Sequence, residues 1–168
     1  MSTNPDPLLS RLSEIVSEHG SRLDQLQKVA SALRASTGNR WVGLYEVDFA
    51  QGEVRNLVWD GPAGPEYPTF PISKGLTSSA IAEKRTVNVG DVESDARYLT
   101  ALGSTCSEII VPVFNDRGDV IGTIDVESEL PNAFDSDTEE MLERCTVVLR
   151  PLFSAEDGSR SNALGIKR

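Results

Sequence analysis

Three acidic residues in the second half of the chain could form a site for a positively charged ligand. Asp125 and Glu127 alternate with apolar residues in one β-rich run, and Glu108 lies at the start of the run before it. A strand places residues two apart on the same face, so both carboxylates share a face, and a tight turn would bring Glu108 near them. An ordinary sheet with one solvated face has the same pattern, and the sequence leaves both alternatives open.

The stretch 107–128 predicts the antiparallel hairpin that would carry these residues. Two β-rich runs, 107–114 and 120–128, flank the turn-forming sequence Asn-Asp-Arg-Gly-Asp, in which Gly118 tolerates a positive φ. The alternation predicts Val120, Gly122, Ile124 and Val126 on the core face, opposite Ile121, Thr123, Asp125 and Glu127. The polar loop 97–105 precedes the hairpin and could fold over the acidic face to make a pocket.

Cysteine and histidine chemistry has less support. The two cysteines, Cys106 and Cys145, have no Cys-x-x-Cys spacing, and His19 is the single histidine, so we expect no metal site, no histidine triad and no cofactor. We expect Cys145 to be a small core residue on a helix, and His19 to be an exposed residue in a helix's last turn.

Composition limits the classes of function. A chain of 168 residues with 39% hydrophobic residues suits one domain with one core. A net charge of -10 without clustered Lys and Arg argues against nucleic-acid binding. There is no apolar run of the roughly 20 residues that span a bilayer and no signal-peptide pattern at the start, so we expect no membrane association and a cytoplasmic location.

Helical periodicity predicts helices at both ends of the chain. Two N-terminal helices occupy 8–37, and a last helix occupies 135–153, where Ser136 and Glu139 fit a capping box. We expect 1–7 and 154–168 to be disordered tails. The apolar stripes of the N-terminal helices would cover a sheet, and the same pair could also form the interface of a homodimer.

The region 39–130 predicts the strands and the loops of a pocket. Trp41, Gly43 and Tyr45 share one face of the first strand, where the aromatic side chains either pack in the core or form the wall of a cavity. A short helix at 76–83 begins with hydroxyl residues that cap it or bind an anion. Together these elements predict an α+β fold: a central antiparallel sheet of five to six strands with the terminal helices on one face and pocket-forming loops on the other.

Several motifs in one order resemble a GAF domain, and more narrowly the free methionine-(R)-sulfoxide reductases. The motifs are Trp41-Val-Gly-Leu-Tyr45, two Gly-Pro pairs after it, Gly75 before a helix, Asp91-Val92, Ser107-Glu-Ile-Ile-Val-Pro112 and Gly122-Thr-Ile-Asp-Val-Glu-Ser128. The resemblance covers about 38–150 and implies a single GAF domain over 8–153. It also implies that Trp41 stacks on the methyl sulfoxide end of a substrate, and that Glu108, Asp125 and Glu127 hold its ammonium.

This sequence departs from the reductase subgroup at both thiols of the two-cysteine reaction. Thr77 stands where the resemblance places one cysteine, and the loop Thr100-Ala-Leu-Gly103 lacks the other. Without them, the expected function is that of a sensory or regulatory GAF domain that binds an amine-containing or amino-acid-like ligand at Trp41, Tyr45, Glu108, Asp125 and Glu127. One alternative is a divergent reductase that uses Cys106. Another is a dimerisation or partner-docking module that passes a signal to a separate protein.

Overall fold

The computed structural model describes residues 4–100 and 102–154, so residues 1–3 of the predicted tail 1–7 and residues 155–168 of the predicted tail 154–168 lie outside the described residues. Their helices are α1 (Pro7–Ser17), α2 (Arg22–Thr37), α3 (Gly75–Glu83) and α4 (Ser136–Ser154), with a 3-10 turn, η1 (Val92–Ser94). The strands are β1 (Trp41–Asp48), β2 (Glu53–Asp60), β3 (Thr69–Pro71), β4 (Val87–Val89), β5 (Ser107–Phe114) and β6 (Val120–Ser128).

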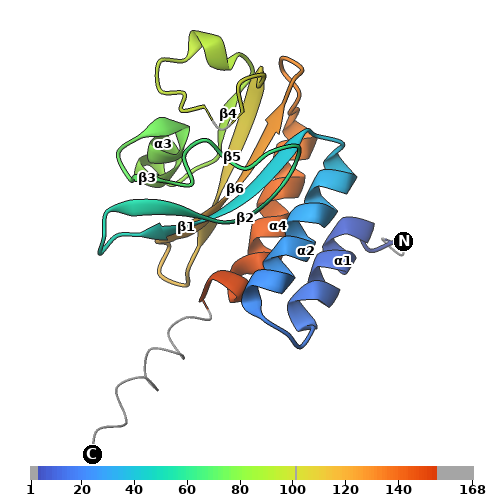
Figure 1. Cartoon of the computed structure of the whole chain (residues 1–168). Helices are drawn as coiled ribbons and strands as arrows, with labels where there is room; N and C mark the ends of the chain where they lie inside the picture. Colours follow the sequence, from blue (N-terminus) through green and yellow to red (C-terminus); the bar gives the residue numbers. More distant parts are fainter. Residues whose placement is uncertain (1–3, 101, 155–168) are drawn as a thin grey trace, which may run out of the picture.

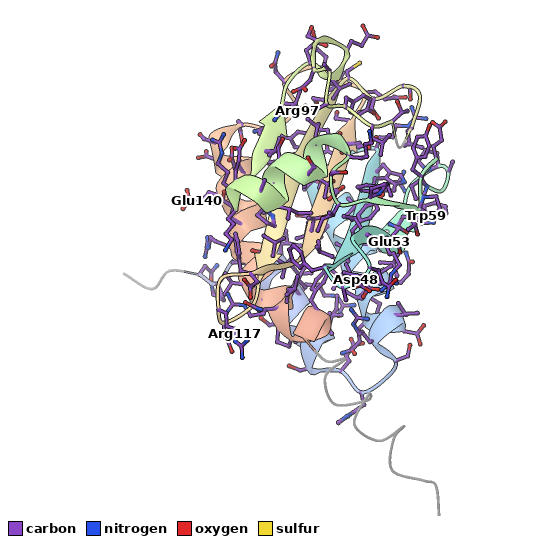
Figure 2. The ribbon with its side chains drawn as sticks, turned by 90° about the vertical axis from the view of Figure 1, so that its left-hand side faces the viewer. Asp48, Glu53, Trp59, Arg97, Arg117 and Glu140 are labelled. Carbon is purple, nitrogen blue, oxygen red and sulfur yellow. The ribbon has the colours of Figure 1, made fainter. Side chains whose placement is uncertain are left out.

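The six strands form one antiparallel sheet in the order β3-β2-β1-β6-β5-β4. The predicted hairpin is β5–β6, and β1 lies on the other side of β6, so β1 and β6 are the two central strands. Figure 1 shows α1, α2 and α4 on one side of this sheet. Figure 2 shows α3 over the strands on the opposite side. The predicted α+β architecture is therefore confirmed.

The apolar stripes of the helices form the main core. α2 and α4 pack on the sheet, and α1 packs against both of them. Fully buried residues from the three helices and the sheet meet there, among them Leu12, Ile15, Leu26, Val29, Leu33, Val42, Leu44, Ile109, Ile124, Val126, Leu142, Cys145 and Leu149. The apolar stripes of the two N-terminal helices are thus buried in the core of the chain itself. None of the described helices combines the length and apolar character that crossing a membrane requires.

The helix ends differ from the predicted ones. α1 begins at Pro7, where the carboxylate of Asp6 accepts a hydrogen bond from the Leu8 backbone N–H at 2.9 Å. The helix ends at Ser17, so the prediction that His19 lies in its last turn was wrong. α4 is capped by Asp135, whose Oδ1 accepts from the Thr138 N–H at 2.8 Å, rather than by Ser136.

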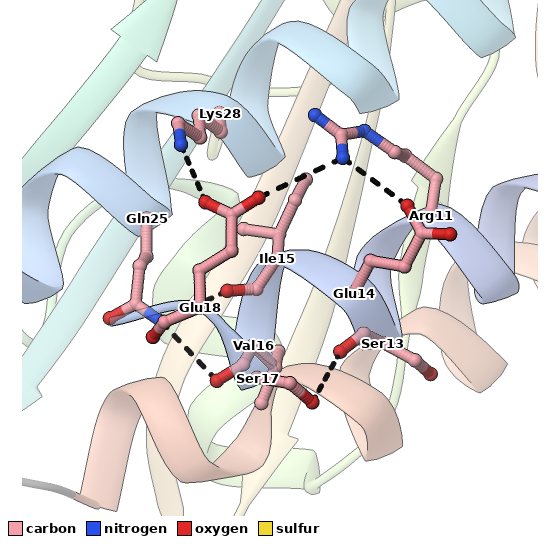
Figure 3. Close-up of polar contacts among 9 residues, drawn as sticks. All are labelled: Arg11, Ser13, Glu14, Ile15, Val16, Ser17, Glu18, Gln25 and Lys28. Atoms are coloured by element: carbon pink, nitrogen blue, oxygen red, sulfur yellow. Dashed lines mark hydrogen bonds and ion pairs between the residues drawn. The ribbon is translucent and has the colours of Figure 1, made fainter. Parts of the chain in front are cut away.

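A buried amide joins α1 to α2, and the sequence analysis did not predict it. The side chain of Gln25 is 9% exposed, and its Nε2 donates to the carbonyl oxygens of Ile15 and Glu18 at 2.9 and 3.0 Å (Figure 3). The last carbonyl groups of a helix have no partner within the helix, so Gln25 satisfies part of this need in α1. The outer surface of the same pair carries ion pairs of Glu18 with Lys28 and Arg11.

A β-bulge corrects the predicted faces at the start of β6. Phe114 pairs with Val120 and Val113 with Gly122, so Ile121 is an extra residue in β6. The extra residue reverses the alternation on its N-terminal side. Val120 therefore packs with Tyr45 on the face away from the helices, and Ile121 packs against the helix-side core. The prediction was correct from Gly122 onward.

Candidate ligand-binding site

A cavity lies on the face of the sheet away from the helices. It has about 350 Å³ of empty space, part of it open to solvent. Its residues come from β1, β3, β5 and β6, from the start of α3, and from the loops that follow β2 and η1: Tyr45, Tyr67, Phe70, Gly75, Leu76, Thr77, Leu99, Thr100, Glu108, Ile110, Asp125 and Glu127. The cavity therefore combines an acidic group on the strands with aromatic and aliphatic side chains around it.

The structure brings the three predicted carboxylates together in this cavity. Glu108 and Glu127 are direct partners on β5 and β6, and Asp125 follows on the same face, opposite Gly43 of β1. Glu108 is only 5% exposed, Glu127 1% and Asp125 4%. The alternative of a solvated acidic face is therefore wrong.

Two threonines hold two of the carboxylates. The hydroxyl of Thr123 donates to Oδ1 of Asp125 at 2.6 Å, and the hydroxyl of Thr105 donates to Oε2 of Glu127. Sequence reasoning did not assign either residue to the site. The alternation already put Thr123 on the acidic face and could have identified it. Thr105 belongs to a loop, and no periodic pattern in the sequence indicates where its side chain lies.

Two carboxylate oxygens in the site have no hydrogen-bond partner. Oε2 of Glu108 and Oε1 of Glu127 are buried and unpartnered among the described residues. A buried carboxylate oxygen without a donor costs free energy, because it has lost its hydration and gained nothing in exchange. The cavity therefore offers two acceptors to a donor that comes from outside the chain.

Burial raises the pKa values of all three acids. It raises the pKa of Asp125 to about 7, although the hydrogen bond from Thr123 acts in the opposite direction. Burial also raises the pKa of Glu127 to about 7, against the hydrogen bond from Thr105 and the charge of Arg40. The pKa of Glu108 lies well above its usual range because of burial, and the charges of Glu127 and Asp125 add to the effect. Protonated carboxyl groups are thus favoured near neutral pH unless a cation is present.

The two predicted aromatic residues have different places. Tyr45 lines the cavity. Trp41 is completely buried, is not among the lining residues, and donates from Nε1 to the carbonyl oxygen of Ala63 at 3.0 Å. Its ring covers Gly43, where an added Cβ would lie 2.2 Å from a ring carbon. The group that approaches Gly43 closely is therefore Trp41, with Tyr45 beside it at a ring-centroid distance of 6.4 Å.

The first turn of α3 forms another wall of the cavity. Gly75, Leu76 and Thr77 line it, and the N-cap residue Lys74 makes no side-chain hydrogen bond to the helix. The predicted capping of this helix by a hydroxyl is therefore absent. Gly75 has a φ of +75°, a conformation that glycine adopts without strain.

Neither cysteine lines the cavity. Cys106 is half-buried, with its Sγ 3.9 Å from the carbonyl oxygen of Ser104. Cys145 lies in the helix-side core, where burial raises the pKa of its thiol to about 12, as expected for a packing residue. Over residues 4–100 and 102–154, no group of three or more His, Cys, Asp or Glu side chains is arranged to hold a metal ion.

Among the proteins to which the chain is similar are a GAF domain-containing protein and free methionine-R-sulfoxide reductases. It is 27% identical over 135 residues to GAF domain-containing protein A of Dictyostelium discoideum, covering 80% of this chain and 83% of that protein. It is 30% identical over 106 residues to a free methionine-R-sulfoxide reductase of Saccharomyces cerevisiae, covering 62% of this chain and 57% of that one. A solved structure of the Neisseria meningitidis free methionine-R-sulfoxide reductase with its substrate aligns with a TM-score of 0.81 and 28% identity, over 94% of this chain and 96% of that one.

The family itself is identified over most of the chain. The sequence model of the GAF domain family matches residues 21–149. This span runs from the N-cap of α2 nearly to the end of α4, and it includes every strand and the whole cavity. The chain therefore belongs to the GAF domain family.

Proposed function

We propose that this GAF domain is a sensory or regulatory domain that binds a small ligand carrying an amine, such as an amino acid. One observation carries the proposal: the buried, unpartnered oxygens of Glu108 and Glu127 beside Asp125. An ammonium group has three N–H donors and a positive charge, so it would satisfy both oxygens and reduce the repulsion among the carboxylates.

The rest of the cavity suits the remaining parts of such a ligand. Phe70, Leu76 and Leu99 offer apolar contacts to a side chain. The first turn of α3 has backbone N–H groups without a side-chain cap, and these favour a carboxylate. An α-amino acid carries an ammonium group, a side chain and a carboxylate within a few bonds of one another.

The test is a binding measurement on the purified chain and three variants. The panel contains the standard amino acids and free methionine-(R)-sulfoxide, screened by thermal shift and quantified by calorimetry. We expect Glu108→Gln and Asp125→Asn each to weaken binding about tenfold or more, because each removes a charged acceptor of the ammonium. Glu140→Gln, an exposed change on α4 (Figure 2), should have no effect. Unchanged affinity in both cavity variants would contradict the amine as the recognised group.

A second candidate is a divergent reductase of free methionine-(R)-sulfoxide. It is supported by the similarity to the Neisseria enzyme, whose structure was solved with its substrate. In this chain, Cys106 would have to attack the sulfoxide sulfur and take its oxygen, which releases methionine and leaves a sulfenic acid on Cys106. Two outside thiols would then have to reduce the sulfenic acid to the thiol, with loss of water and formation of their own disulfide. Cys106→Ser should then abolish the formation of methionine in the presence of a reductant. Turnover that survives this change would remove Cys106 from the mechanism.

The predicted homodimer, the separate signalling partner and the cytoplasmic location stay predictions. The alternative of a docking module places its functional surface on the N-terminal helices. In the described part of the chain, the outer face of α1 carries charged residues such as Arg11 and Glu14, and the apolar stripe is buried. Sedimentation of the chain with and without a bound amino acid would measure the oligomeric state directly.

A further inference from the structure

The acidic group in the cavity has too little positive charge near it to be fully ionised. No Lys, Arg or His is among the cavity-lining residues of the described chain. Arg40 faces Glu127, but its guanidinium group also forms an ion pair with the exposed Glu129. The threonine hydroxyls satisfy one oxygen each of Asp125 and Glu127, and no donor among the described residues satisfies Oε2 of Glu108.

The other elements around the cavity add no charge that could replace a cation. β1 contributes Tyr45, whose pKa is raised by burial and then by the charges of the three acids, so the phenol stays neutral. The loop after β2 contributes Tyr67. α3 and the loop after η1 contribute no titratable side chain to the lining. Three carboxylates in this space would repel one another without solvent to screen them.

We propose that the empty cavity stores at least one proton on the Glu108–Glu127 pair, and that binding of an amine ligand releases this proton to the solvent. The ligand in this inference rests on the proposed function, whereas the stored proton is a property of the protein alone. In the exchange, a carboxyl O–H bond breaks and the proton passes to water or buffer. The ammonium of the ligand keeps its N–H bonds and donates them to the carboxylate that is formed, and no electrons are transferred.

The exchange makes occupancy of the site depend on pH. For each proton released, affinity rises about tenfold per pH unit while the empty site is protonated, and it levels off once the empty site has lost its protons. Because burial raises the pKa of Glu108 well above its usual range and those of Asp125 and Glu127 to about 7, the empty site still holds protons at neutral pH, and the steep part of the dependence extends through neutral pH. A change of cytosolic pH near neutrality would therefore alter ligand occupancy at a constant ligand concentration.

The release can be counted by calorimetry. L-methionine and free methionine-(R)-sulfoxide are titrated at pH 6.5 in buffers with different heats of ionisation, and the dependence of the observed heat on the buffer gives the number of protons released. We expect at least one proton for the unmodified chain and for Glu140→Gln, and clearly fewer for Glu108→Gln. Binding without proton release would overturn this inference and leave the proposed function in place.

A second measurement needs no ligand. Infrared difference spectra of the empty protein, recorded over a pH titration, detect the C=O band of a protonated carboxyl group. We expect this band to persist above about pH 6, where exposed acids are ionised, and to weaken in Glu108→Gln and Glu127→Gln. Absence of the band would overturn the stored proton whatever binds. Presence of the band with no binding of any amino acid would support the stored proton but overturn the proposed function, and with it the exchange.

Discussion

Alternate residues of β6 face two different environments. Ile124 and Val126 point toward the helices, where they are completely buried among apolar side chains. Asp125 and Glu127 point into the cavity, where they are almost as deeply buried but have carboxylates for neighbours. The two faces thus exclude solvent to a similar degree with side chains of opposite character.

The difference separates the residues that stabilise the fold from those that lower its stability. Burial of an aliphatic side chain is favourable by about 1.5–3 kcal/mol, whereas burial of a carboxylate is unfavourable unless it is paired and hydrogen-bonded. The cavity face carries this unfavourable free energy when no ligand is bound, so a bound cation should stabilise the chain. The comparison therefore predicts that substitutions on the two faces act with opposite sign.

The largest effect is expected on the helix face. Ile124→Ala removes completely buried methyl and methylene groups from the main core, so the free energy of unfolding should fall by about 2–5 kcal/mol. Urea denaturation followed by circular dichroism measures this loss. Leu130→Ala, at a side chain that is 68% exposed, is the control and should stay within about 0.5 kcal/mol. Equal losses in the two variants would break the comparison.

The next effect is expected on the cavity face, and it depends on pH. Since the pKa of Asp125 is raised to about 7, the folded chain binds more protons than the unfolded chain between about pH 4 and 7, and stability falls as pH rises through that window. Asp125→Asn removes this pH-dependent loss of stability. The free energy of unfolding of the variant, relative to that of the unmodified chain, should therefore rise by about 2–4 kcal/mol from pH 5 to pH 8. Unfolding free energies across this range measure the gain, and Glu140→Gln should show none.

A third effect concerns the boundary of the cavity. Gly43→Ala would place a Cβ 2.2 Å from the Trp41 ring and 2.9 Å from the Tyr45 ring, so at least one ring must move. We expect a loss of about 1–3 kcal/mol and weaker ligand binding, because Tyr45 lines the cavity. Gly103→Ala, where an added Cβ has no neighbour within 4 Å, is the matched control. Unfolding experiments and calorimetric titrations on both variants measure stability and ligand affinity. Equal values for Gly43→Ala and Gly103→Ala would contradict the prediction.

Periodicity in the sequence was sufficient to predict most of the fold. Alternation predicted the faces of β1, and of β6 from Gly122 onward, because each strand has one apolar face. It failed at Ile121, since a bulge depends on the partner strand and leaves no signal in one strand alone. It also missed Gln25, a polar residue in an apolar stripe whose partners belong to the preceding helix.

The site was predictable where strands supply it. Glu108, Asp125 and Glu127 meet because sheet register places them together, and register follows from the hairpin. Trp41 shares their face but lies outside the lining, because its ring occupies the space above Gly43. The contacts of Thr105 and of the first turn of α3 depend on how loops fold over the sheet. A single sequence does not contain that information in periodic form.

The smallest effect would sharpen the comparison at the level of one hydroxyl group. Thr123→Val keeps the shape of a completely buried side chain and removes the hydrogen bond that favours the ionised form of Asp125. The pKa of Asp125 should therefore rise further, and the variant should lose about 1 kcal/mol at pH 8 and much less at pH 5, where Asp125 is protonated.

Thr146→Val is the matched control for that change. The Thr146 hydroxyl is also buried, but it donates to the carbonyl oxygen of Glu143 in α4, a neutral acceptor, at 2.6 Å. Its loss should be independent of pH, because no titrating group is involved. Unfolding free energies of both variants at pH 5 and pH 8 test the contrast. A pH-independent loss in Thr123→Val would mean that Asp125 does not titrate in this range, and the acidic face would then differ from the helix face only in polarity.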